Sequence, residues 1–273
     1  MEVGWIKGSE ISIKIQTKDP NWSDQCQFAR PHIIILLTDF AKMFKLILLS
    51  LITLTQSSVV DVDWVGASWW PDCREYSAFV YNLLSTKPDI NAIVNFAFWP
   101  TQGQEKTLTK CSNNQTAPFD SYLCEIDHYE ACTLEHLDCI GGCNDAAKQM
   151  QLFTFLNCFE GNHSSHPKNS DFPSSKSWMP YLTPCAKLAQ LDHKAISKCS
   201  TDITKGSKLH TAYKKITTYI ASLPLKYYPW VEVNNEEIKD GYDTCLLHSI
   251  CGNYTSLPKP KSCTNMPKPP VGC

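Results

Sequence analysis

The sequence predicts an α/β fold, and three stretches carry this prediction. Residues 59–65 (VVDVDWV) alternate apolar and acidic side chains with the two-residue period of a half-buried strand. Apolar residues from Tyr76 to Leu84 recur at intervals of three and four, the spacing of one helical face, and Pro88 ends the pattern. Residues 91–99 (NAIVNFAFW) form a second run of strand-forming side chains. A strand, a helix and a strand in this order predict a parallel βαβ unit.

The second half of the sequence predicts a helical insertion followed by a return to the sheet. Residues 121–222 are rich in cysteine and mainly helical in pattern. Residues 226–238 (KYYPWVEVNNEEI) alternate again, and the pair Asn234–Asn235 suits a tight hairpin turn because asparagine tolerates positive φ. Residues 240–251 predict a closing helix. Together these elements predict a thioredoxin-like fold over residues 59–257, with a cysteine-rich, mainly helical insertion.

The N-terminal part of the sequence predicts export. Residues 43–58 (MFKLILLSLITLTQSS) have the basic start, the apolar run and the small polar end of a signal peptide. We expect Met43 to be the true start, so residues 1–42 are an upstream extension of doubtful status. The alternative is a membrane anchor over residues 33–54. Charged side chains divide that stretch into two apolar runs, each shorter than the roughly 18–20 residues that a membrane span needs.

Cysteine is the strongest compositional signal, with 14 in 273 residues. This density predicts an oxidising compartment and a disulfide framework, and two of the cysteines lie in a Pro/Lys-rich tail at residues 258–273. Three sequons, at Asn114, Asn162 and Asn253, are candidate glycosylation sites. We therefore expect a secreted or lysosomal protein with no membrane contact after signal cleavage. The net charge of −2 gives no basis for nucleic-acid binding.

One cluster of side chains admits a metal-binding alternative. Cys132, His136, Cys139 and Cys143 are spaced by three and four residues, which could gather zinc ligands on a helix. In an exported, oxidised chain, cysteines in such a pattern are more often paired in disulfides. We therefore predict no metal site and no cofactor.

Four segments of the chain resemble the gamma-interferon-inducible lysosomal thiol reductase family. They are WPDCREY at 70–76, CEIDHYEAC at 124–132, the interval from Cys185 to Cys199, and YYPWVEVNNEEI at 227–238. Their order and spacing extend the resemblance over most of the chain after the signal peptide. The resemblance implies a thioredoxin-like fold, thiol–disulfide oxidoreductase activity and disulfide-containing proteins as substrates in an acidic compartment.

The departures from the family pattern lie mainly at the active site. The first cysteine of the family's Cys-x-x-Cys pair is Trp70 here, so only Cys73 of that pair is present. The first cysteine of the family's second motif is best matched by Cys111, and the asparagine of that motif falls on Asp127. Four cysteines have no counterpart in the family pattern: Cys139, Cys143, Cys245 and Cys273.

The missing sulfur is the one that attacks a substrate disulfide, whereas Cys73 matches the sulfur that resolves the mixed disulfide. The neighbouring Asp72 also disfavours a thiolate, because like charges repel. A small external thiol could replace the missing sulfur as electron donor and give slow monothiol exchange. We therefore expect an impaired reductase with Cys73 as its single catalytic residue.

A non-catalytic function could use the same groove. Trp69, Trp70, Tyr228 and Pro229 would line a binding site for an extended peptide, and the resemblance implies a cis peptide bond before Pro229. Trp70 could instead fill the vacated site as a plug, which is the interpretation that we favour for its side chain.

Parity and strand periodicity set the remaining expectations. Without Cys26 of the upstream extension 13 cysteines are left, and Cys73 is then the odd, reactive free thiol. The other twelve cysteines are expected to form six disulfides: Cys111, Cys124, Cys132, Cys139, Cys143, Cys158, Cys185, Cys199, Cys245, Cys251, Cys263 and Cys273.

On the first strand, Asp61 and Asp63 share one face and are expected to be exposed.

Overall fold

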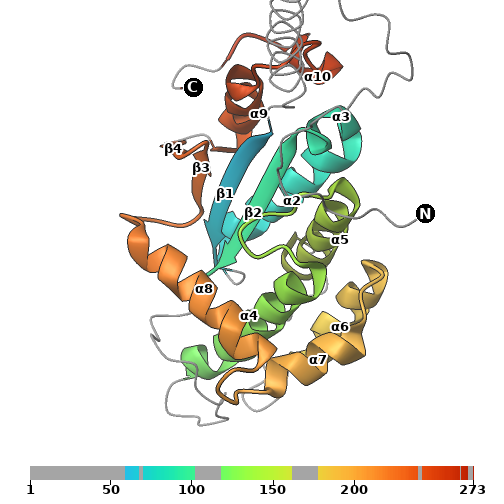
Figure 1. Cartoon of the computed structure of the whole chain (residues 1–273), viewed down its shortest axis with the longest axis vertical. Coiled ribbons are helices and arrows are strands. Elements are labelled where there is room, and N and C mark those ends of the chain that lie inside the picture. The colour runs from blue at the N-terminus through green and yellow to red at the C-terminus, as the bar shows by residue number, and fades with distance from the viewer. Residues whose placement is uncertain are drawn as a thin grey trace, which may run out of the picture. The chain divides into compact units, whose positions relative to one another are not determined.

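The computed structural model describes residues 59–67, 70–101, 118–161, 178–238, 242–264, 266–269 and 273. All of them lie within one unit of the chain, from Ser57 to Cys273. The elements follow one another in this order (Figure 1): β1 (Val60–Gly66), α2 (Pro71–Thr86), α3 (Pro88–Asn91), β2 (Val94–Pro100), α4 (Pro118–Leu137), α5 (Ala146–Leu156), the π-helix η1 (Asn157–Gly161), α6 (Met179–Leu188), α7 (His193–Thr201), α8 (Lys208–Ser222), β3 (Trp230–Val233), β4 (Glu236–Glu237), α9 (Tyr242–Asn253) and α10 (Lys261–Thr264).

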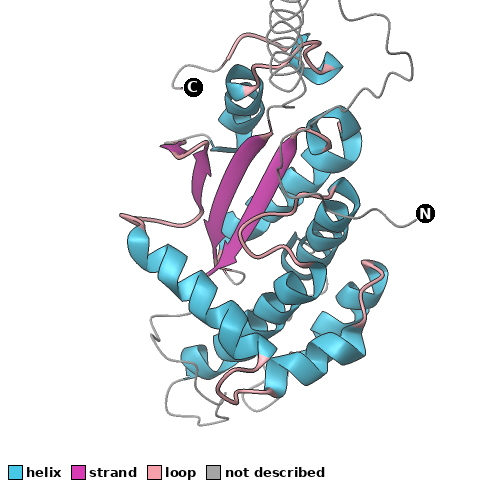
Figure 2. Cartoon of the chain, in the orientation of Figure 1, coloured by secondary structure: helices cyan, strands magenta, loops and turns pink. Residues whose placement is uncertain are grey.

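The strands form a mixed four-stranded sheet with the order β2-β1-β3-β4 (Figure 2). β1 and β2 are parallel and joined by α2 and α3, which confirms the predicted βαβ unit. β3 runs antiparallel to β1, and β4 returns antiparallel to β3. Asn234 and Asn235 turn this hairpin at φ values of 50° and 65°, as their tolerance of the left-handed region predicts. The observed fold class is therefore mixed α/β.

One face of the sheet is buried by α2 and α5. The indole of Trp64 on β1 lies 5.1 Å from the ring of Tyr76 on α2 and 6.3 Å from that of Phe153 on α5, measured between centroids. The period of the apolar residues in α2 directs its buried side chains to this face. The other face receives α8, whose Tyr219 stacks on Trp99 of β2 at 3.9 Å.

The helical insertion begins at α4 and ends with α8, and most of its helices lie below the sheet in the view of Figure 2. Side-chain caps explain where several of these helices begin. Asp145 accepts hydrogen bonds from two backbone N–H groups in the first turn of α5, and Asp192 does the same for α7. Ser207 accepts one from His210 N at the start of α8. Such caps satisfy donors that the helix itself leaves unpaired.

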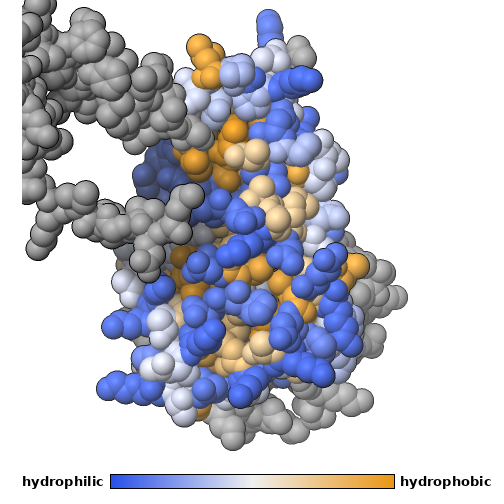
Figure 3. Space-filling model, turned by 45° about the vertical axis from the view of Figure 1, so that its right-hand side comes forward, coloured by the Kyte–Doolittle hydropathy of each residue, from blue (hydrophilic) through white to orange (hydrophobic). Residues whose placement is uncertain are grey.

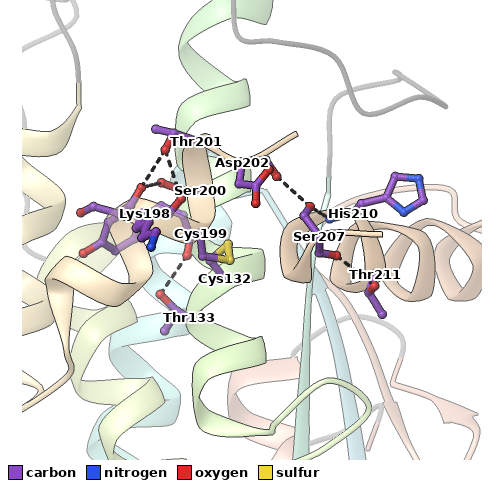
Figure 4. The surroundings of a disulfide bond; sticks show 12 residues. Cys132, Thr133, Lys198, Cys199, Ser200, Thr201, Asp202, Ser207, His210 and Thr211 are labelled. Atoms are coloured by element: carbon purple, nitrogen blue, oxygen red, sulfur yellow. Dashed lines mark hydrogen bonds between the residues drawn. A yellow bond between two sulfur atoms is a disulfide. The ribbon is translucent and has the colours of Figure 1, made fainter. Parts of the chain in front are cut away.

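Disulfides link the helices of the insertion to one another and the tail to α9. Figure 4 shows Cys132 on α4 next to its partner Cys199 on α7. Because three cysteines of the predicted zinc alternative form disulfides, that alternative is wrong. Cys124 is also disulfide-bonded, and Cys111 lies outside the described residues. The described pairs are Cys132–Cys199, Cys139–Cys143, Cys158–Cys185, Cys245–Cys273 and Cys251–Cys263.

The tail is held by more than its two cysteines. Ser262 donates hydrogen bonds from both its backbone N and its hydroxyl to the Asp89 carboxylate on α3, at 2.8 and 2.7 Å. None of the helices in the described part of the chain is long and apolar enough to cross a membrane. The predicted signal peptide at 43–58 and the alternative anchor at 33–54 lie outside that part.

Among the described residues, large hydrophobic side chains are rarely exposed. On the face drawn in Figure 3, hydrophilic side chains surround smaller hydrophobic patches. Half of the exposed large hydrophobic residues in the described ranges are aromatic, and these aromatic residues fall in two segments, at the start of α2 and just before β3. The exposed set is Val59, Trp70, Leu188, Tyr227, Tyr228 and Leu257.

Candidate functional site

The candidate site lies where β1 ends and α2 begins. β1 ends at Gly66, and Trp70 is the N-cap of α2, with extended backbone at φ −79° and ψ 130°. Pro71 occupies the first helical position, where its fixed φ favours the helix and its missing N–H costs nothing. The turn is closed by a 2.8 Å hydrogen bond from Trp70 N to Ala67 O. The predicted groove residue Trp69 lies outside the described residues.

Cys73 sits in the first turn of α2 with its thiol turned into the protein. Its side chain is fully buried, and it is the free cysteine of the described residues. Its Sγ accepts a hydrogen bond from Ala67 N at 3.3 Å. The thiol therefore faces the end of β1 rather than the solvent.

The surroundings of Cys73 oppose its ionisation. Burial raises the pKa of the thiol well above its ordinary value, and the charges of Glu160, Asp72 and Glu130 raise it further, while the hydrogen bond from Ala67 N acts in the opposite direction. Glu160 on η1 and Glu130 on α4 are both buried. We predicted a reactive free thiol at Cys73, but its burial and raised pKa imply slow reaction in the native protein.

Two carboxylates near the thiol, those of Glu130 and Glu160, were not predicted from the sequence. They lie 57 and 87 residues after Cys73 in the chain; Glu130 falls within the segment CEIDHYEAC but received no role there, and Glu160 lies outside the four segments. The structure brings η1 to the start of α2, where Arg74 Nε donates a hydrogen bond to the backbone oxygen of Glu160 at 2.9 Å. Only the tertiary fold, with η1 packed against α2, places the two carboxylates near the thiol.

The raised pKa of Cys73 predicts a loss of stability at alkaline pH. The unfolded thiol ionises from about pH 8.5, whereas the folded thiol stays protonated. Above that pH the folded state binds more protons, so the free energy of unfolding falls by up to about 1.4 kcal/mol per pH unit. Denaturant unfolding between pH 7 and 10 measures this slope.

The matched control is Cys73→Ala, which removes the titrating group. Its free energy of unfolding should decline less steeply than that of the wild type between pH 8 and 10. Equal slopes in the two proteins would show that the thiol ionises alike in the folded and unfolded states.

Residues 227–230 provide the second side of the site. The Tyr228–Pro229 peptide bond is cis, as predicted. Burial raises the pKa of Tyr228, and the charge of Cys73 raises it further, which places the phenol near the thiol. Tyr228 is 36% exposed, and Tyr227 donates a hydrogen bond from its hydroxyl to Glu237 Oε1 at 2.7 Å. The segment thus presents aromatic side chains to the solvent beside Cys73.

Trp70 does not fill a vacated site. Its side chain is 41% exposed, which contradicts the interpretation of a buried plug and favours an exposed aromatic surface at the start of α2. The backbone accounts for this exposure. Cys73 lies within the first turn of α2 and points inward, whereas Trp70 is the N-cap residue and has extended rather than helical backbone.

The predicted exposure of Asp63 was wrong. Its carboxylate accepts a hydrogen bond from Trp99 Nε1 at 2.7 Å and another from Tyr219. Burial raises the pKa of Asp63, the two hydrogen bonds lower it, and the charge of Asp61 raises it again, so that the net shift is upward. Asp61 is exposed, as predicted. The two aspartates differ in exposure because α8 covers only part of the sheet face that carries them.

The other predicted site residues lie away from Cys73 or outside the described ranges. Asn114 and Asn162 are outside those ranges. Asn253, at the end of α9, donates from Nδ2 to Ser249 O at 3.0 Å and accepts from Asn234 Nδ2 at 3.2 Å. Within the described residues, no group of three His, Cys, Asp or Glu side chains could hold a metal ion.

The fold and the site define an α/β protein with a buried free thiol, Cys73, in the helix that follows the first described strand. No family model matches the chain. The chain is 24% identical over 200 residues to the gamma-interferon-inducible lysosomal thiol reductase of Mus musculus. The match covers 72% of this chain and 69% of the mouse protein. The relative is thus named for thiol reduction, the chemistry that the sequence motifs indicate.

Proposed function

We propose that this chain is a divergent relative of the gamma-interferon-inducible lysosomal thiol reductases, with a thioredoxin-like fold, that acts in the secretory or lysosomal pathway. Three observations support the relationship. The βαβ unit is followed by an antiparallel hairpin in the same sheet. Cys73 lies in the first turn of the helix after β1, and the cis Pro229 lies in the segment beside it. The similarity to the mouse enzyme supports the same relationship.

We further propose that dithiol reduction is impaired in this chain. The observation that carries this proposal is the pairing of an indole at position 70 with a buried thiol at position 73. A dithiol reductase needs one accessible thiolate to attack and a second thiol to resolve the mixed disulfide. Trp70 has no sulfur, and Cys73 is buried with a raised pKa. What remains is slow monothiol exchange that depends on a small external thiol.

A second function, binding of extended peptides without chemistry, is favoured by the exposed aromatic residues. Trp70 and Tyr228 are 41% and 36% exposed, and Tyr228 directly precedes the cis Pro229. Aromatic side chains bury a large apolar area for a small loss of conformational entropy, so an exposed pair is suited to contact a peptide. Such a site needs no accessible thiol, which fits the burial of Cys73.

Two variants separate these functions. Reduction of a protein disulfide by the wild-type chain, with a small thiol as donor, should stay close to the uncatalysed rate, and Cys73→Ser should remove the remainder. Binding of unfolded, alkylated polypeptide should survive Cys73→Ser, but Trp70→Ala should weaken it by about tenfold. Val59→Ala, which alters another exposed hydrophobic side chain, is the control. Fast wild-type turnover would contradict the proposed impairment, and unchanged binding by Trp70→Ala would contradict the peptide site.

A further inference from the structure

The disulfide between Cys245 and Cys273 differs from the other described disulfides in its accessibility. Cys273 is exposed, whereas every other described cysteine is buried or half-buried. Its partner Cys245 lies on α9 and is 3% exposed. The C-terminal end of the chain lies beside α9 in Figure 1, in agreement with this bond. Cys273 is therefore the solvent-exposed residue of this pair, and Cys245 is the buried one.

The same bond lines a cavity of about 260 Å³ between α9 and the β3–β4 hairpin. Both cysteines contribute to its wall, together with the polar side chains of Glu236, Glu237, Ser249 and Asn253. Among the described residues, the lining contains two carboxylates and no lysine, arginine or histidine. The cavity is thus polar, negatively charged and in contact with a disulfide.

We propose that the Cys245–Cys273 disulfide is a second thiol-exchange site, which takes small thiols that carry an amino group. The carboxylates of Glu236 and Glu237 attract a cationic or zwitterionic aminothiol and repel an anionic thiol of the same size. The exposed Cys273 is the sulfur that such a thiol attacks. Neither residue has a counterpart in the family pattern, and this site is independent of Cys73.

The exchange proceeds in two balanced steps. The thiolate of the small thiol attacks Cys273 Sγ, a new disulfide forms between them, and the Cys245–Cys273 bond breaks. Cys245 leaves with the electron pair of that bond and takes a proton from solvent. A second small thiolate then attacks the sulfur of the first, so that Cys273 leaves and is protonated. Two small thiols are oxidised to one disulfide, and the protein disulfide is reduced to two thiols.

Comparison with the neighbouring disulfide isolates the effect of access. Cys251–Cys263 also joins α9 to the tail, but Cys251 is buried and Cys263 is half-buried. Cys139–Cys143 is buried at both ends. Access of a thiolate to the sulfur sets the rate of exchange, so these two bonds should open later.

The test uses the native full chain, treated with cysteamine or 3-mercaptopropionate, quenched with acid, alkylated and mapped by mass spectrometry. Cys245 and Cys273 should be labelled about tenfold faster than Cys251 and Cys263. Cysteamine should react faster than 3-mercaptopropionate at equal thiolate concentration. Glu236→Gln should reduce the ratio of the cysteamine rate to the 3-mercaptopropionate rate. Glu75→Gln, a matched loss of charge on α2, should leave that ratio unchanged.

Three outcomes would overturn the inference: an earlier opening of another bond, simultaneous opening of all bonds, or equal rates for the two thiols. Cys73→Ser serves to separate this site from the proposed function. Exchange at Cys245–Cys273 should persist at the wild-type rate in that variant. If exchange is lost there, the two sites are not independent.

Discussion

Trp70→Cys is expected to raise dithiol reductase activity about 100-fold or more over the wild type, because it places an attacking sulfur at the start of α2. A cysteine at the N-cap lies beside unpaired backbone N–H groups, which lower its pKa. Cys73 follows at the spacing of a Cys-x-x-Cys pair, and the cis Pro229 remains in place. Reduction of a protein disulfide with a small thiol as donor measures the gain.

The structure also predicts which step limits this variant. Cys73 must ionise to resolve the mixed disulfide, and its pKa is raised by burial and by nearby carboxylates. The mixed disulfide between the introduced cysteine and the substrate should therefore accumulate. Its resolution should accelerate as the pH rises, because the fraction of Cys73 thiolate grows below the pKa. Acid quenching and mass spectrometry detect the intermediate.

Two control variants define the result. Trp70→Ser removes the same side chain without adding a sulfur, so it should stay inactive. Trp70→Cys combined with Cys73→Ser should trap substrate without releasing it. Trp70 is 41% exposed, so its loss should cost about 1–2 kcal/mol of stability, less than for a buried indole. A folded Trp70→Cys protein that remains inert would show that the groove has lost more than one sulfur.

Removal of the Cys132–Cys199 disulfide is expected to cost about 4 kcal/mol of stability. This bond joins α4 to α7 across 67 residues, so its loss returns a large conformational entropy to the unfolded chain. The double substitution Cys132→Ser and Cys199→Ser tests this expectation by denaturant unfolding. Both positions are replaced so that no unpaired thiol can form new disulfides.

The disulfide Cys139–Cys143 is the matched comparison, because it spans only 4 residues. Its double serine variant should lose about 2 kcal/mol under the same loop-closure relation. The quantity to measure is the difference between the two variants in their free energy of unfolding. A larger loss at Cys139–Cys143 would mean that local packing, rather than loop length, governs the contribution of these bonds.

Local patterns were sufficient for most of the fold. The alternation in 59–65 and the three- and four-residue spacing after Tyr76 depend on neighbouring residues alone, so β1 and α2 were predicted close to their observed bounds. Asn234 and Asn235 predicted their own turn, because the tolerance of asparagine for positive φ is a property of the single residue. The motifs around Trp70, Cys73 and Pro229 likewise located the site.

The tertiary structure decided what that site can do. Burial of Cys73, exposure of Trp70 and partial burial of Asp63 depend on which helices cover which face of the sheet. Glu160 reaches the start of α2 only because η1 packs there, and no periodicity relates residues so far apart. The choice of disulfide partners also depended on the tertiary structure. Parity predicts how many cysteines pair, but only the folded chain brings two sulfurs within bonding distance. The sequence by itself determined the elements and the residue types of the site. Their ionisation and accessibility required the packed structure, because both depend on the solvent and charges that remain around each group after folding.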